Sequence, residues 1–289
     1  MKSKIRIILY LIIIVITAAA SIFLIRKGEN NPIAMEDKNN FNFGWAADPL
    51  WDDGKAEVAT YTAERIIYGE TRYFEYIHIL VKETFNEEYH VKTDDYSRND
   101  LYEVMKINKF ARIETRDYPY HFLSSLFFLR DDPTVVNKFT NSSQEWCGNT
   151  FKHFSRDNTG YTYYYDSYWD QEGRGSTIVP LDVTFEDQLT YTLRTLKFED
   201  GLNFKWKIVE SQVTNKATPP VIYEGSISVL PYVGDPENPG WEVRVDLDEE
   251  KTNTYWISGT YPNFLLKMET WDGRKLELKQ VERYSYWQE

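Results

Sequence analysis

The richest concentration of reactive groups lies mid-chain, in the stretch Ser142 to Asn149. It places an amide, a carboxylate, an indole and the only thiol of the protein at four successive positions, Gln144, Glu145, Trp146 and Cys147. A thiol becomes a nucleophile when a nearby base takes its proton, and Glu145 and His153 are the candidate bases along the chain. Because a single cysteine excludes an internal disulfide, the Cys147 thiol is either reactive or buried and inert.

The expected local structure argues against a thiol nucleophile. Residues 144–154 have the composition of a β-strand, in which Cys147 and His153 lie about 20 Å apart at ~3.3 Å per residue. A strand also directs Trp146 and Cys147 to opposite faces. We therefore interpret the stretch as a structural node: a covered strand that buries both side chains, while Gln144 and Glu145 bond to nearby backbone or turn groups.

Carboxylates beside tryptophan form a second candidate chemistry. Two acidic segments of the chain each adjoin a tryptophan, one near residue 51 and one near residue 169. Indole rings and paired carboxylates are components of sugar-binding sites and of glycosidase acid–base pairs, although acidic residues are also ordinary in turns. The two tyrosines of Tyr118-Pro119-Tyr120, which we expect to open an apolar strand, add further rings. The candidate ligand-binding residues outside the cysteine stretch are Trp51, Asp53, Tyr118, Tyr120, Trp169 and Glu172.

Composition argues against several other functions. The histidines His78, His90, His121 and His153 form no pair at metal-ligand spacing, so we expect neither a metal nor a cofactor. The chain has 33 basic and 45 acidic side chains, and its first 27 residues hold five of the basic ones and no acid. The remainder therefore has 28 basic side chains and a formal charge of −17. Such an acidic surface repels phosphate backbones, which argues against nucleic-acid binding.

The dominant sequence pattern is that of β-structure. Aromatic residues make up 16% of the chain, and apolar residues alternate with polar ones between turn signals such as Asp272-Gly273. One segment differs, because Phe185, Leu189, Leu193 and Leu196 recur at helical spacing. We predict a β-dominated α+β fold: a large curved antiparallel sheet or open half-barrel packed around one amphipathic helix, preceded by an N-terminal transmembrane helix.

The N-terminal segment predicts where the protein resides. Residues 7–25 form an uncharged apolar run of 19 residues, just long enough to span a bilayer. The run stays apolar beyond the small residues Ala18-Ala19-Ala20, which favours an uncleaved anchor over a removed signal peptide. Basic residues ahead of the run favour a cytoplasmic N-terminus. We therefore predict a membrane anchor over 1–27, a linker over 28–44 and an extracytoplasmic β-rich domain over 45–289, in a single-pass protein of the cytoplasmic (inner) membrane.

Six stretches of the sequence resemble a family of bacterial envelope proteins, commonly lipoproteins, that often carries the label "septum formation inhibitor Maf". They are Trp51 to Glu57, Tyr68-Gly69-Glu70, Val91 to Asp94, Tyr118-Pro119-Tyr120, Ser142 to Gly148 and Ser167 to Gly173. The label implies a nucleotide pyrophosphatase, but the Ser-Pro-Arg-Arg signature of true Maf proteins is absent, as is a cysteine placed for lipidation. The C-terminal hairpin is similar to the endings of half-barrel envelope proteins of the LolA type, which implies a comparable curved sheet.

Two functions are compatible with this sequence. The first is a membrane-anchored extracytoplasmic binding or scaffold protein that holds a lipid, another apolar ligand or a glycan on an aromatic-lined curved sheet, or docks another envelope protein. The second is an envelope hydrolase that uses the carboxylates near Trp51 or Trp169. The sequence shows no converging catalytic set, which favours the binding protein over the enzyme.

Overall fold

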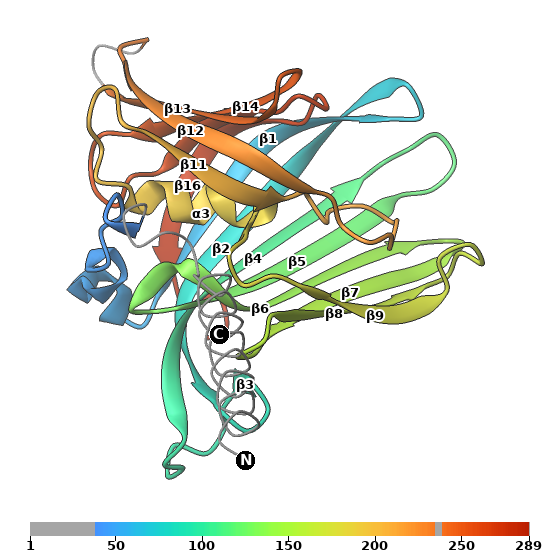
Figure 1. The fold of residues 1–289 in the computed structure, drawn as a ribbon, viewed down its shortest axis with the longest axis horizontal. Helices are drawn as coiled ribbons and strands as arrows, with labels where there is room; N and C mark the ends of the chain where they lie inside the picture. Colours follow the sequence, from blue (N-terminus) through green and yellow to red (C-terminus); the bar gives the residue numbers. More distant parts are fainter. Residues whose placement is uncertain (1–37, 235–238, 289) are drawn as a thin grey trace, which may run out of the picture.

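The computed structural model describes residues 38–234 and 239–288, and most of these residues belong to one large sheet (Figure 1). Two short 3-10 helices, η1 (Trp45–Ala47) and η2 (Pro49–Asp52), precede the sheet. Its strands are β1 (Ala56–Ile67), β2 (Glu70–Asn86), β3 (Val91–Lys92), β4 (Leu101–Ile113), β5 (Tyr120–Leu129), β6 (Asp132–Glu145), β7 (Gly148–Arg156), β8 (Tyr161–Ser167), β9 (Arg174–Val179), β10 (Thr184–Phe185), β11 (Asn203–Val209), β12 (Ile222–Tyr232), β13 (Gly240–Asp248), β14 (Lys251–Ser258), β15 (Leu265–Glu269) and β16 (Lys275–Tyr284).

The sheet is antiparallel almost throughout and does not close on itself. Its order is β10-β11-β12-β13-β14-β15-β16-β1-β2-β4-β5-β6-β7-β8-β9, with β3 paired to β2 off this path. The short β10 runs parallel to β11, and every other pair is antiparallel. Because chain neighbours are mostly sheet neighbours, short turns connect most strands. The predictions of a β-dominated fold and a large open antiparallel sheet are confirmed.

A helical segment lies inside the curve of the sheet (Figure 1). The sequence pattern predicts one continuous helix, but the structure has a single α-helical turn, α3 (Leu189–Thr192), between the 3-10 turns η3 (Glu186–Gln188) and η4 (Leu193–Thr195). Two hydrophobic clusters meet at this segment. One joins its leucines to β11–β14, and the other joins Phe185 and Tyr191 to rings of β5–β8, including Phe128, Phe139, Phe154 and Tyr163.

A buried ion pair fastens this segment to the sheet. The Arg194 guanidinium donates to both carboxylate oxygens of Glu57 on β1, at 2.7 and 2.9 Å. Both side chains are buried, at 5% and 3% exposure. Arg194 also donates to the carbonyls of Pro262 and Asn263 and lies over the Trp45 ring. Such bidentate geometry offsets part of the large cost of burying two charges.

A row of polar side chains crosses the concave face. His78, Lys109, Ser124, Asn141 and Lys152 stand in register on β2, β4, β5, β6 and β7, and all five are buried. The two ammonium groups donate to backbone carbonyls, Lys109 to Asp187 and Lys152 to Lys216, and neither forms an ion pair with a carboxylate within residues 38–234 and 239–288. Burial lowers the pKa of each lysine to about 8.

The structure moves one predicted boundary. Phe41 is fully buried and bridges Leu196, and the Asn42 amide donates to the Thr195 carbonyl at 2.7 Å. Packing therefore begins inside the predicted 28–44 linker, because this ring fills space beside Trp206. The predicted anchor over 1–27 lies outside the described residues. Within those residues, no helix has the length and apolarity needed to cross a membrane.

Removing the charge of Glu57 should destabilise the fold strongly. We expect Glu57→Gln to lower the free energy of unfolding by about 3–5 kcal/mol, because Arg194 would keep a buried, uncompensated charge. The exposed pair Lys279–Glu75, at 2.6 Å, is the matched control, and Glu75→Gln should cost less than about 1 kcal/mol. Urea unfolding of both variants checks this, and equal costs would contradict the role assigned to the buried pair.

The two buried lysines should make stability depend on pH. Between pH 8 and 10 the unfolded chain keeps protons on Lys109 and Lys152 that the folded protein has released, so the free energy of unfolding should rise with pH. Each pKa unit corresponds to about 1.4 kcal/mol. The slope should flatten in a Lys109→Met/Lys152→Met double variant and persist in the exposed-site control Lys205→Met. Urea unfolding across this range measures it, and a falling or flat wild-type profile would contradict the assignment.

Candidate functional site

Four hairpin turns gather at one end of the sheet, at the right in Figure 1. They join β1 to β2, β4 to β5, β6 to β7, and β8 to β9, and antiparallel pairing brings all four to the same end. Four of the six stretches that resemble the envelope family lie here. We call the ring-bearing surface that they form the aromatic rim; it comprises Tyr68, Tyr118, Trp146, Tyr168 and Trp169.

The rings of the rim form two groups, one of Tyr68, Tyr118 and Trp146 joined through Tyr120, and one of Tyr168 and Trp169 with centroids 5.3 Å apart. Tyr118 stacks on Trp146 with centroids 6.1 Å apart, and it contacts Tyr120 at 5.7 Å. The Tyr68 and Tyr120 hydroxyls share a hydrogen bond. Burial and this bond raise the pKa of Tyr120. Trp146 is nonetheless 78% exposed and Tyr68 is 71% exposed. Clustered exposed rings of this kind are typical of a binding surface.

Backbone conformation holds two of these rings in place. Tyr68 adopts φ 54° and Gly69 φ 74°, so the β1–β2 turn places a bulky residue in the left-handed region at a cost of about 1–3 kcal/mol. At the β6–β7 turn, a Cβ on Gly148 would lie 2.4 Å from the Tyr168 ring. Only glycine therefore lets Tyr168 lie against this turn.

The connection between β11 and β12 crosses the concave face beside the rim. We call its residues 213–218 the strap, and side chains of the sheet bind its backbone. Lys152 donates to the Lys216 carbonyl at 2.8 Å, and the Ala217 amide donates to Glu172 at 2.8 Å. The Asn215 amide group donates to Glu145 at 2.9 Å. These contacts fix the strap against β6–β9.

Polar groups lie beneath and beside the rings of the rim. The second carboxylate oxygen of Glu145 and the Ser143 hydroxyl are buried and have no hydrogen-bond partner within the described residues. The Lys216 ammonium lies 5.4 Å from the Trp169 ring and remains exposed. The exposed Lys216 ammonium beside the Trp169 ring is therefore a polar group that the rim presents to a ligand, whereas Glu145 and Ser143 lie beneath the surface.

Most of the predicted site residues lie close together in the structure. The predicted conformation of residues 144–154 is wrong. Residues 144–154 are not one strand: Glu145 pairs with Gly148, and Trp146 and Cys147 form the turn between β6 and β7. Both side chains are exposed, so the buried structural node is wrong. The predicted site residues that lie at or beside the rim are Tyr118, Tyr120, Gln144, Glu145, Trp146, Cys147, Trp169 and Glu172.

Trp51 and Asp53 lie elsewhere, near η2. The Trp51 ring is buried and its indole N–H donates to the Trp45 carbonyl and to the Tyr261 hydroxyl. Arg283 stacks on the Trp51 ring at 5.0 Å and donates to Asp53 at 2.9 Å. Trp51 and Asp53 therefore hold the segment around η2 against β16, and neither faces the rim.

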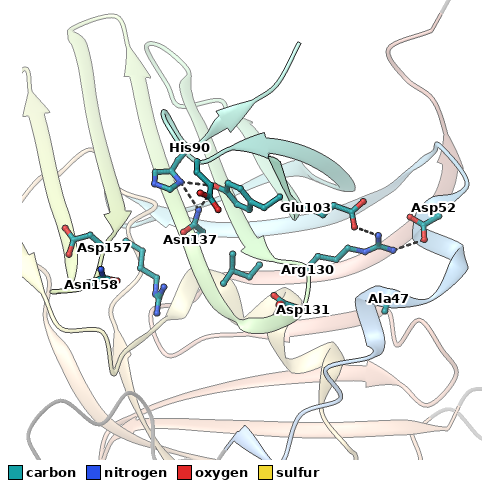
Figure 2. Close-up of a pocket in the computed structure, with 13 residues that line it drawn as sticks. Ala47, Asp52, His90, Glu103, Arg130, Asp131, Asn137, Asp157 and Asn158 are labelled. Atoms are coloured by element: carbon teal, nitrogen blue, oxygen red, sulfur yellow. Dashed lines mark hydrogen bonds and ion pairs between the residues drawn. The ribbon is translucent and has the colours of Figure 1, made fainter. Parts of the chain in front are cut away.

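A cleft lies near η2, and it is lined by residues that the sequence analysis did not single out (Figure 2). This cleft has a volume of about 1050 Å³. His90, Tyr102 and Asn137 form a hydrogen-bonded trio in it, with the Asn137 amide donating to the Tyr102 hydroxyl at 2.7 Å and the His90 ring 2.9 Å from that hydroxyl. These residues come from a turn and two strands, and no sequence spacing links them.

The carboxylates of the cleft are held in their charged form. Arg130 joins Asp52 and Glu103, at 2.8 and 2.6 Å, as Figure 2 shows. Hydrogen bonds from Arg130 and Lys82 lower the pKa of Asp52. Burial raises the pKa of Glu103, but the same two donors outweigh it and lower that pKa overall. A general acid needs a raised pKa, so this pair is unsuited to protonating a leaving group.

Comparison with known proteins adds little. No family model matches the chain, and no curated protein matches it. A crystal structure of a DUF1089 family protein from Pseudomonas aeruginosa is similar at 11% identity and a TM-score of 0.28, covering 57% of this chain and 77% of that one. A score this low does not establish a shared fold.

An exposed turn at Trp146-Cys147 predicts a small loss of stability on truncating Trp146 and a reactive thiol at Cys147, whereas a buried node predicts the reverse. We expect Trp146→Ala to change the free energy of unfolding by less than about 1 kcal/mol, because its ring is mostly in water. Gly148→Ala should cost more, about 1–3 kcal/mol, since its Cβ would collide with Tyr168. Cys147 should react with a thiol reagent in the native protein about as fast as in urea. Slow native labelling would show that the turn is covered.

Proposed function

We propose that the protein is a glycan-binding protein of the bacterial envelope, anchored in the cytoplasmic membrane by its N-terminal segment, and that the aromatic rim is its binding surface. The apolar run over residues 7–25 supports the anchor. The observation that carries the binding function is the convergence of exposed rings and hydrogen-bonding groups from four hairpin turns and the strap.

The chemistry of the rim suits a sugar. A pyranose presents C–H groups on its faces and hydroxyls around its edge. Indole and phenol rings provide rigid contact area at a low entropic cost, and they tolerate a polar ligand because one edge of each ring is polar. The exposed Lys216 ammonium beside the Trp169 ring supplies a donor for sugar hydroxyls.

An apolar ligand is less well supported than a glycan. The concave face is filled by the helical segment, the strap and the two hydrophobic clusters. The cavity between Lys109 and Arg274 on this face has a volume of about 50 Å³, room for a water or two and not for an acyl chain. The formal charge of −17 beyond residue 27 also opposes docking on anionic lipid.

No observation favours the hydrolase. Three of the carboxylates near the two tryptophans already have partners: Asp52 pairs with Arg130, Asp53 with Arg283, and Glu172 accepts from Ser167 and Ala217. Such bonds stabilise the charged form of a carboxylate, whereas a glycosidase needs one protonated and one charged group facing the scissile bond. The rim therefore supports binding without bond cleavage.

Binding of purified envelope glycans to the full-length protein in neutral detergent micelles tests the proposal. We expect at least one peptidoglycan or capsular fragment to bind without being cleaved, and Trp146→Ala to weaken that binding about tenfold or more, because exposed ring anchors often dominate such interfaces. The matched control is Tyr96→Ala, which removes a 69% exposed ring in the loop that follows β3, away from the rim. No binding to any glycan, or equal loss in the two variants, would contradict the proposal.

A further inference from the structure

A groove of about 430 Å³ lies on the outer side of the sheet, away from the helical segment. Its floor comes from β2, β4 and β5, where strand alternation directs Lys106 and Phe127 outwards while Ile107 and Leu126 face the core. The short β3 and the segment after β16 form its sides. The residues that line the floor and sides through their side chains include Glu83, Lys92, Lys106, Phe127, Lys138 and Trp287.

Positive charge exceeds negative charge in this groove. Glu83 is its carboxylate, and it is shared between Lys106 at 2.6 Å and Lys92 at 3.5 Å. Lys138 donates to the His90 carbonyl at 3.1 Å and forms no ion pair with a carboxylate of the described chain. A fourth lysine of the lining, Lys82, pairs with two carboxylates outside the groove. The other three ammonium groups and Glu83 leave a local excess of two positive charges. That excess contrasts with the strongly acidic remainder of the protein.

Aromatic side chains lie between the lysines. Register places Lys106, Phe127 and Lys138 side by side on β4, β5 and β6. The Phe127 ring packs on Phe85 at 4.9 Å, and the Lys138 ammonium lies 5.9 Å from the same ring. Trp287 adds a half-exposed indole to the side of the groove. The groove therefore combines a cationic group with flat apolar walls.

We infer that this groove binds a small anion that bears a ring, with the anionic group among Lys92, Lys106 and Lys138 and the ring against Phe127 and Trp287. A volume of about 430 Å³ falls in the range of small-molecule sites. The ligand class follows from the two halves of the groove: ammonium groups recognise a phosphoryl or carboxylate group, and the rings recognise a planar apolar part.

The state of Lys138 supports an anionic occupant. This side chain is half-buried, and burial lowers the pKa of its ammonium group. Burial removes water from the charged ammonium group of Lys138, and a bound anion would replace part of that lost interaction. Binding of the anion and of the proton on Lys138 should therefore favour each other. The groove is separate from the aromatic rim, because none of its lining residues belongs to the rim or the strap.

Titration calorimetry on the full-length protein in neutral detergent micelles tests this inference with three probes: phenylphosphonate, inorganic phosphate and phenol. We expect phenylphosphonate to bind most tightly, because it alone satisfies both halves of the groove. Lys138→Gln and Lys92→Gln should each weaken phenylphosphonate about fivefold to tenfold, whereas Lys138→Arg should retain most of the affinity. Trp287→Ala should weaken phenylphosphonate and leave phosphate unchanged.

The control variant Lys205→Gln removes an exposed lysine outside the groove. Equal weakening by Lys205→Gln and Lys138→Gln would show a non-specific charge effect and overturn the inference. Phosphate binding as tight as phenylphosphonate would overturn the role of the rings. The side chain of Lys92 is 58% exposed, so Lys92→Gln should fold and keeps the test decisive if Lys138→Gln does not.

Discussion

The buried ion pair between Arg194 and Glu57 is the interaction on which the rest of the structure depends. It joins the helical segment to β1, near the middle of the sheet order, while the same guanidinium binds carbonyls of the β14–β15 connection. A wide open sheet has no closing strand to set its curvature. A charge that must keep its partner inside the core therefore fixes the helical segment against β1 and the β14–β15 connection, and the two hydrophobic clusters pack the sheet around that segment.

The curvature of the sheet determines whether the hairpin turns can form one surface. Antiparallel pairing alone puts four turns at one end, but only a curved sheet brings them round the strap so that Trp146, Tyr168 and Lys216 share one surface. The strap is held by polar side chains of the sheet and its turns, which a purely apolar concave face would not provide. Lys152 and Glu172 bind its backbone, so part of the buried polar row supports the proposed binding surface rather than the core.

Local sequence patterns predicted the β-rich character of the chain. They did not predict the turn at Trp146-Cys147 or which face of β2 points to the core. Alternation predicted the β-dominated pattern, and Asp272-Gly273 predicted the turn before β16, because a period of two and turn residues are local signals. The turn at Trp146-Cys147 was missed, since it contains neither glycine nor proline and both residues are normally buried. In β2, sequence shows two faces but not which is inside. The face with Tyr76 and His78 lies inward, while Ile77, Ile79 and Val81 form a small outer cluster.

The sequence by itself determined the β-rich class, the turns rich in glycine and aspartate, the position of the helical segment and the identity of most rim residues, because each depends on contacts between chain neighbours. Only the tertiary structure decided that four separate turns form one surface, that Lys92, Lys106 and Lys138 surround Phe127, and that His90, Tyr102 and Asn137 meet in one cleft. Those groupings depend on strand order and register, which arise from pairing between distant segments and leave no spacing in the sequence.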